Sequence, residues 1–131
     1  MKRILLVEDN EDNRDLVCAL LEGRYWVDEC KDAGEALQRL NQAHDDARPD
    51  LLLLDISLPS MDGVELLRRI REDSQLARIP AVALTAHAMK DDGNRFRAAG
   101  FDGYVTKPIV DEALLLEAIA GLLHREDGKE P

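Results

Sequence analysis

The residues LLLLDISLPSMDG, Leu51 to Gly63, place an aspartate directly after four consecutive leucines. A run of large aliphatic side chains without polar alternation is typical of a strand that is buried on both faces of a parallel sheet. An ionised carboxylate is costly to bury unless a cation or hydrogen-bond donors accompany it. The stretch therefore predicts a buried strand over 51–55 that presents Asp55 at its carboxyl end.

Short apolar runs recur along the chain and share this character. Three of them are rich in Leu, Val or Ile without polar alternation, which favours buried parallel strands. Segments long enough for amphipathic helices separate the runs, and this alternation predicts one parallel sheet with helices on both faces. The expected strands are RILLVE (3–8), YWVDEC (25–30), LLLLD (51–55), AVALT (81–85) and GYVT (103–106).

Helix-start signals mark the segments between the strands. Asp32 and Glu35 have the spacing of a capping box at the start of the second expected helix. The segment 111–123 carries acidic residues in its first turn, where the helix dipole favours them. We expect one domain over residues 1–124, followed by a tail over 125–131 that has little apolar content and frays.

The composition is that of an ordinary globular domain, with 45% hydrophobic and 34% charged residues. A net charge of −10 repels phosphate backbones and anionic membranes, so nucleic acid and membrane surfaces are not expected partners. The apolar runs fall short of membrane-spanning length, and MKRILLVED (1–9) turns acidic too soon for a signal peptide, so we expect neither a membrane span nor a signal peptide. Cys18 and Cys30 lack metal-ligand spacing and are interpreted as reduced thiols of a cytoplasmic protein.

Polar side chains stand where four of the expected strands end. They are Glu8 and Asp9, Asp55, Thr85 and Lys107. Taken singly, the acids suit a helix start, the threonine suits a helix N-cap, and the lysine suits a solvated surface. In an open α/β sheet, however, the carboxyl ends of the strands form one edge, and sites lie along that edge. The combination therefore favours a functional site.

The chemistry of this set is specific. Carboxylates held close together repel one another unless a cation joins them, and a few hard oxygen ligands suit Mg²⁺. A carboxylate can act as a nucleophile toward phosphorus. The metal and Lys107 would then neutralise charge on the phosphoryl oxygens, and Thr85 would donate a hydrogen bond to one of them.

These residues lie in motifs that resemble the receiver (response regulator) domain of two-component signalling. The motifs are ILLVEDNEDNR (4–14), PDLLLLDISLPSMDGVEL (49–66), IPAVALTAHAM (79–89) and AAGFDGYVTKPI (98–109), in the order and spacing of the family. The resemblance covers roughly residues 2 to 124 and implies a doubly wound, flavodoxin-like (βα)5 fold with sheet order 2-1-3-4-5. The chain looks most like stand-alone regulators of chemotaxis and the cell cycle.

The resemblance implies chemical roles for individual residues. Asp55 matches the phosphoacceptor, and Lys107 matches its cationic partner. Glu8 and Asp9 match the acidic pair that holds Mg²⁺, with Asp9, Asp55 and the backbone carbonyl of Ser57 as protein ligands. Many members have Asp-Asp where this chain has Glu-Asp, which leaves open whether Glu8 reaches the metal directly or through water.

The resemblance also implies a switch and two structural positions. Thr85 matches the hydroxyl that contacts the phosphoryl group, and Tyr104 matches the aromatic switch position. The partner surface would be the face built by the fourth helix, the fifth strand and the fifth helix. Pro108 would follow a cis peptide bond, and Gly63 would let the chain turn tightly into the third helix.

The expected function is a phospho-accepting switch and not an enzyme in the usual sense: it promotes only its own phosphorylation and slow dephosphorylation. Its partners would be a sensor histidine kinase or histidine phosphotransfer protein and a downstream protein. An alternative is a receiver excised from a larger response regulator or hybrid histidine kinase, and another is a degenerate receiver that only docks.

Unrelated classes fit less well. A flavodoxin-like cofactor binder needs a phosphate loop where this chain has EDNEDN, and a P-loop NTPase needs GxxxxGK[ST], which is absent. A haloacid-dehalogenase-like phosphatase places a second aspartate two residues after its nucleophile, where this chain has Ser57.

Overall fold

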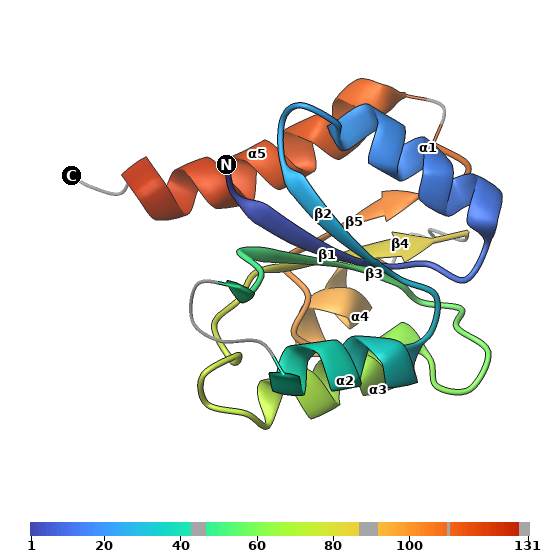
Figure 1. Cartoon of the computed structure of the whole chain (residues 1–131), viewed down its shortest axis with the longest axis vertical. Helices are drawn as coiled ribbons and strands as arrows, with labels where there is room; N and C mark the ends of the chain where they lie inside the picture. Colours follow the sequence, from blue (N-terminus) through green and yellow to red (C-terminus); the bar gives the residue numbers. More distant parts are fainter. Residues whose placement is uncertain (43–46, 87–91, 110, 129–131) are drawn as a thin grey trace.

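The computed structural model describes residues 1–42, 47–86, 92–109 and 111–128. Strands and helices alternate along the described chain, as the sequence predicts (Figure 1). The elements are β1 (Arg3–Val7), α1 (Glu11–Leu21), β2 (Trp26–Cys30), α2 (Ala33–Gln42), β3 (Leu51–Asp55), α3 (Gly63–Arg71), β4 (Ala81–Thr85), α4 (Asp92–Ala98), β5 (Gly103–Thr106) and α5 (Glu112–Gly128). Residues 87–89 of the third motif and 129–131 of the expected tail lie outside the described residues.

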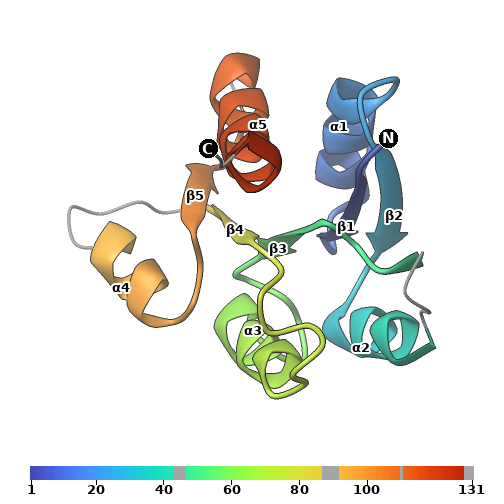
Figure 2. The ribbon, with the colours of Figure 1, turned by 90° about the vertical axis from the view of Figure 1, so that its left-hand side faces the viewer.

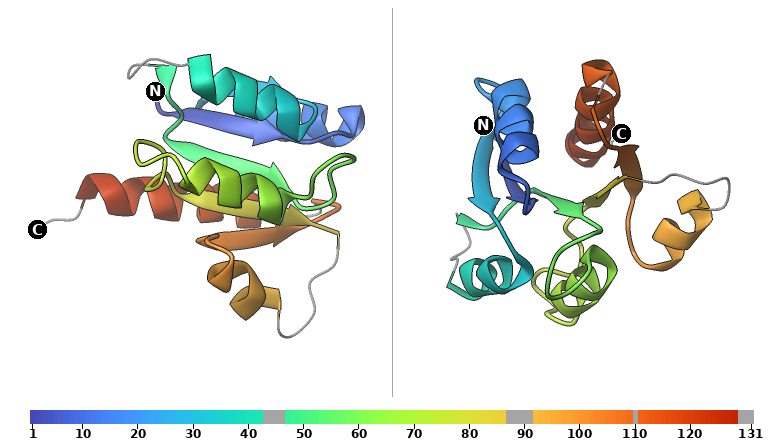
Figure 3. Two further views of the ribbon diagram at one scale, coloured as in Figure 1. Left: turned by 90° about the horizontal axis from the view of Figure 1, so that it is seen from below. Right: turned by 90° about the vertical axis from the view of Figure 1, so that its right-hand side faces the viewer.

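All five strands are parallel and follow the order β2-β1-β3-β4-β5, which confirms the predicted topology. The strand arrows run in one direction in the left panel of Figure 3. The register pairs Val7 with Leu54, so the next residues along these two strands, Glu8 and Asp55, lie side by side. Polar residues from distant parts of the sequence therefore meet at one end of the sheet.

Helices cover both faces of the sheet. Helices α1 and α5 lie on one face, and α2, α3 and α4 lie on the other (Figure 2 and the right panel of Figure 3). The four leucines of β3 divide between these layers: Leu51 and Leu53 pack toward α1 and α5, and Leu52 and Leu54 pack toward α2 and α3. Each leucine is fully buried, and burial of such a side chain contributes about 1.5–3 kcal/mol.

The helix starts follow the capping signals in the sequence. At α2, Asp32 Oδ1 accepts a hydrogen bond from the Glu35 N–H at 2.7 Å. Glu35 Oε1 in turn accepts from the Lys31 N–H at 2.9 Å, one residue before the position in an ideal capping box. The reciprocal bonds still satisfy two backbone donors at this helix start.

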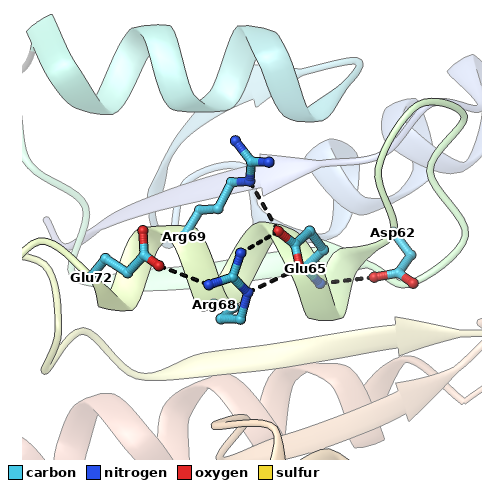
Figure 4. A network of polar contacts seen from close by, with 5 residues as sticks. All are labelled: Asp62, Glu65, Arg68, Arg69 and Glu72. Carbon is cyan, nitrogen blue, oxygen red and sulfur yellow. Dashed lines mark hydrogen bonds and ion pairs between the residues drawn. The ribbon is translucent and has the colours of Figure 1, made fainter.

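Helix α3 carries an exposed network of charged side chains (Figure 4). Asp62 caps the helix by accepting from the Glu65 N–H at 2.8 Å. Glu65 pairs with Arg68 and Arg69, and Arg68 also pairs with Glu72 at 2.7 Å. Hydrogen bonds from Arg68 and then Arg69 lower the pKa of Glu65 to about 2. Exposed pairs of this kind stabilise a protein little, but the cap fixes where α3 begins after the loop that follows Asp55.

Both cysteines are free thiols: Cys30 is buried and Cys18 is half-buried. Burial raises the pKa of each thiol to about 11, so the reactive thiolate is scarce at neutral pH.

None of the helices in the described part of the chain is long and apolar enough to cross a membrane.

Gly63 starts α3 where the chain passes close to the end of β3. Its φ is not positive, so the reason for glycine is space and not a left-handed conformation. A Cβ at this position would lie 2.4 Å from the backbone oxygen of Asp55. The tight turn expected at Gly63 is thus a close approach between two backbone segments.

We predict that Gly63→Ala destabilises the fold by about 1–3 kcal/mol, because the backbone of β3 must shift to admit the methyl group. Gly121→Ala is the matched control: it is a helical, exposed position with no atom near the added Cβ. The control should stabilise by about 0.5–1 kcal/mol through helix propensity. Urea unfolding measures both, and equal stability of the two variants would contradict the proposed close approach.

Candidate functional site

Asp55 is delivered to the sheet edge by the buried strand β3 and is itself 1% exposed. One carboxylate oxygen, Oδ1, accepts a hydrogen bond from the Ser57 N–H at 3.0 Å. The other, Oδ2, lies 3.1 Å from Lys107 Nζ. That contact is an ion pair without good hydrogen-bond geometry, so Oδ2 accepts no well-directed hydrogen bond from any described residue. A buried oxygen in this state is open to a further ligand.

Glu8 and Asp9 follow β1 and face the same space. Glu8 is fully buried, whereas Asp9 is exposed. Glu8 Oε2 accepts from the Asn10 N–H at 3.1 Å, and Oε1 lies 3.2 Å from Lys107 Nζ. Glu8, Asp9 and Asp55 each offer a carboxylate oxygen, and these three oxygens lie within 4.8 Å of one another.

Lys107 bridges the two buried carboxylates from the end of β5. Its N–H donates to the Thr85 carbonyl at 2.7 Å, which extends the pairing of β4 and β5 by one residue. The peptide bond from Lys107 to Pro108 is cis, as the resemblance implies. Partial burial alone would lower the pKa of Lys107, but the ion pairs with Asp55 and Glu8 outweigh burial and raise the pKa above its usual value.

The site holds more negative than positive charge. Burial raises the pKa of Glu8 from 4.5 to about 7, and repulsion from Asp55 adds to this effect, while the Asn10 N–H and Lys107 oppose it. One ammonium group therefore only partly compensates three carboxylates.

The donor set fits a hard divalent cation. Closely spaced carboxylate oxygens and the incompletely satisfied Asp55 Oδ2 are the ligands that Mg²⁺ prefers. Glu8, Asp9 and Asp55 are thus the described residues able to hold it. The Ser57 carbonyl, which the resemblance adds to this set, belongs to the loop directly after Asp55, and its ligand role stays a prediction.

Thr85 and Tyr104 lie on the neighbouring strands. Thr85 is 5% exposed at the end of β4, directly after Leu84, the register partner of Asp55. Tyr104 in β5 is 39% exposed, and its ring centroid lies 5.6 Å from that of Phe96 in α4. The two residues are on adjacent strands, so a shift at the end of β4 has a short route to the Tyr104 ring.

Two contacts in and around the site escaped the sequence analysis. Arg14 Nη1 donates to the Glu8 carbonyl at 2.9 Å, and the Phe96 ring packs against the Tyr104 ring in a tilted arrangement. Arg14 ends the motif ILLVEDNEDNR, so a signal existed, but nothing in the sequence showed which backbone group it would meet. Phe96 carried no signal beyond its apolar character.

Comparisons with known proteins agree on one family. The family model described as response regulator receiver domain matches residues 4–120. The polar-differentiation response regulator DivK of Brucella anthropi is 41% identical over 109 residues, covering 82% of this chain and 85% of the relative.

Solved structures are similar as well. The chemotaxis protein CheY4 of Vibrio cholerae has a TM-score of 0.84 at 28% identity, covering 94% of this chain and 99% of that chain. The receiver domain of the sensor histidine kinase PA1611 from Pseudomonas aeruginosa has a TM-score of 0.80 at 32% identity, covering 93% of this chain and 97% of its own. That structure has a magnesium ion coordinated in its active-site cleft.

The raised pKa of Glu8 predicts a pH-dependent stability of the metal-free protein. Between pH 4.5 and about 7 the folded protein keeps a proton that the unfolded chain releases, so its free energy of unfolding falls as pH rises through this window. Glu8→Gln removes this titration. In EDTA, we expect the variant to melt at a higher temperature than the wild type at pH 8 and at a similar temperature near pH 4.5.

Glu22→Gln, which changes an exposed glutamate at the end of α1, is the matched control and should show no such pH-dependent difference. A Glu8→Gln effect of equal size at both pH values would show that the buried carboxylate does not titrate in this window.

Proposed function

The chain belongs to the response regulator receiver domain family, and from that membership we propose that it is a phospho-accepting signalling switch that acts in the cytoplasm. Asp55 would take a phosphoryl group from a phosphohistidine of a sensor histidine kinase or a histidine phosphotransfer protein. The observation that carries the proposal is the Asp55 carboxylate: it is buried at the end of β3, paired with Lys107, and left with one oxygen that lacks a directed hydrogen bond.

The chain's own residues suit this transfer. Glu8, Asp9, Asp55 and the Ser57 carbonyl would hold Mg²⁺, which when bound neutralises charge on the phosphoryl oxygens. A carboxylate oxygen of Asp55 forms the new bond to phosphorus, the P–N bond of the donor breaks, and its electron pair stays with the imidazole. Lys107 Nζ, already beside Asp55 Oδ2, is placed to pair with the added negative charge.

The same site would release the phosphoryl group slowly. Fast hydrolysis of an aspartyl phosphate needs a general base that activates water beside the phosphorus, and Ser57 stands where a haloacid-dehalogenase-like phosphatase carries its second aspartate. Serine cannot supply that proton transfer near neutral pH. The expected behaviour is one phosphoryl group per chain and not rapid turnover.

The output surface would be the face formed by α4, β5 and α5. Tyr104 lies on it, half in solvent and half against the Phe96 ring, and an amphipathic side chain is stable in either surrounding. A groove of about 370 Å³ on this face is lined by residues that include Tyr104, Leu122, Asp102 and Glu117. Movement of Thr85 toward a phosphoryl group on Asp55 would change the space beside Tyr104 and so this groove.

Two protein architectures fit this function: a single-domain regulator and a receiver domain within a larger protein. The DivK relative supports a single-domain regulator, since the match covers 85% of its length. The PA1611 receiver supports a domain of a hybrid histidine kinase, at a TM-score of 0.80. The intact mass of the protein purified from its own cells separates the two.

We predict that acetyl phosphate and Mg²⁺ add one phosphoryl group to the wild-type chain and none to Asp55→Asn, because the amide is not a nucleophile toward phosphorus. Intact-mass spectrometry measures the product. The matched control is Asp62→Asn, which changes a nearby carboxylate but keeps its N-cap acceptor. The control should be phosphorylated normally; undiminished phosphorylation of Asp55→Asn would sink the assignment.

We further predict that Thr85→Ala still accepts the phosphoryl group, since Asp55, Asp9 and Lys107 are unchanged. The variant should transmit the conformational change from Asp55 to Tyr104 poorly, because the coupling hydroxyl is lost. The measurement compares NMR shifts that beryllofluoride, a phosphoryl mimic, induces in the wild type and the variant. Residues around Tyr104 should shift less in the variant. Equal shifts in both proteins would show that the hydroxyl does not couple Asp55 to Tyr104.

A further inference from the structure

The backbone that carries the acidic pair is held by a side chain. Strand β1 ends at Val7, and the Glu8 N–H still donates to the Cys30 carbonyl of β2 at 3.0 Å. The Glu8 carbonyl accepts from Arg14 Nη1 at 2.9 Å. This carbonyl belongs to the peptide that joins Glu8 to Asp9, so the guanidinium fixes the plane of that peptide.

Arg14 is itself fixed on several sides. Its N–H donates to the Asn10 carbonyl at 2.9 Å, which places it in the first turns of α1. Its Nε lies 3.4 Å from Glu29 Oε1 on β2, and its side chain is only 18% exposed. Helix α1 lies beside β1 and β2 in Figure 2. The guanidinium thus joins the loop of the acidic pair to a helix and to a strand.

We propose that Arg14 is a positioning residue for the magnesium site, holding the Glu8–Asp9 peptide so that both carboxylates point toward Asp55. The inference rests on the proposed function, because it assigns Arg14 a part in binding the same metal. Groups that orient the ligands of a metal, without touching it, raise affinity by reducing the ordering that binding requires.

The charge of Arg14 and its hydrogen bond to the Glu8 carbonyl have opposite expected effects on Mg²⁺ affinity. A cation near the site repels Mg²⁺, so loss of the Arg14 charge alone would tighten binding. Loss of the Arg14 donor leaves the Glu8 carbonyl without its partner and frees the peptide to rotate, which would weaken binding. Position is the stronger effect because Glu29 already offsets the guanidinium charge and solvent ions screen the remainder.

The test is calorimetric titration of the metal-free full chain with MgCl₂ at fixed pH and ionic strength. Arg14→Met, which removes donor and charge, should raise the Kd about 10-fold, at the lower end of such effects on metal affinity. Arg14→Lys keeps a donor and the charge and should restore a Kd close to the wild-type value. Glu29→Gln keeps an oxygen acceptor beside Arg14 and removes the charge that offsets the guanidinium, so it should raise the Kd by less than Arg14→Met does.

A stability control separates positioning from general loosening of the fold. Ile70 is a buried residue of α3, and Ile70→Val should lower the melting temperature. The substitution leaves Glu8, Asp9 and Arg14 unchanged, so the Kd should stay the same. The inference is overturned if the Kd of Arg14→Met is unchanged or lower than that of the wild type. It is also overturned if Ile70→Val raises the Kd as much as Arg14→Met does. Either result leaves the proposed function intact. Absence of Mg²⁺ binding by the wild type overturns both.

Discussion

Lys107 Nζ lies 3.1 Å from an Asp55 oxygen and 3.2 Å from a Glu8 oxygen, and the candidate site depends on this bridge. Two carboxylates at 0% and 1% exposure are costly to bury unless a cation or hydrogen-bond donors compensate their charge. One ammonium cannot fully offset Glu8, Asp9 and Asp55, and the raised pKa of Glu8 records the remaining imbalance. The carboxylates therefore leave negative charge that a divalent cation would compensate.

The fold keeps this charged edge rigid by burying what lies behind it. The leucines of β3 contribute alternately to two cores, one beneath α1 and α5 and one beneath α2 and α3. A shift of β3 would disturb both cores at once, so Asp55 has little freedom to move. Gly63 adds to this constraint, since the start of α3 packs directly against the Asp55 backbone.

Two routes lead outward from the same edge. On the β1 side, Arg14 ties the acidic loop to α1 and to Glu29 of β2. On the β4 side, Thr85 lies between Asp55 and the strand that carries Tyr104, whose ring contacts Phe96 of α4. The contacts of Arg14 would hold the metal ligands still. The contacts on the β4 side would transmit a conformational change from Asp55 to the ring of Tyr104. Because these two sets of contacts are separate, the metal ligands would stay fixed while the end of β4 moves.

The sequence by itself determined the strands, the sheet order through family resemblance, and the residues at the carboxyl ends of the strands. These are local properties: LLLLD is apolar without alternation, and Asp32 caps the helix that follows it. Only the tertiary structure decided which of these residues touch. Lys107 and Glu8 are 99 residues apart in the chain, and their contact depends on the register of all the strands between them. The Glu8 carbonyl needed a donor because β1 ends there, and Gly63 needed space because another segment crosses it. Both requirements, a hydrogen-bond donor for one carbonyl and space at one Cα, come from segments that meet only in the fold. No local sequence pattern predicts them.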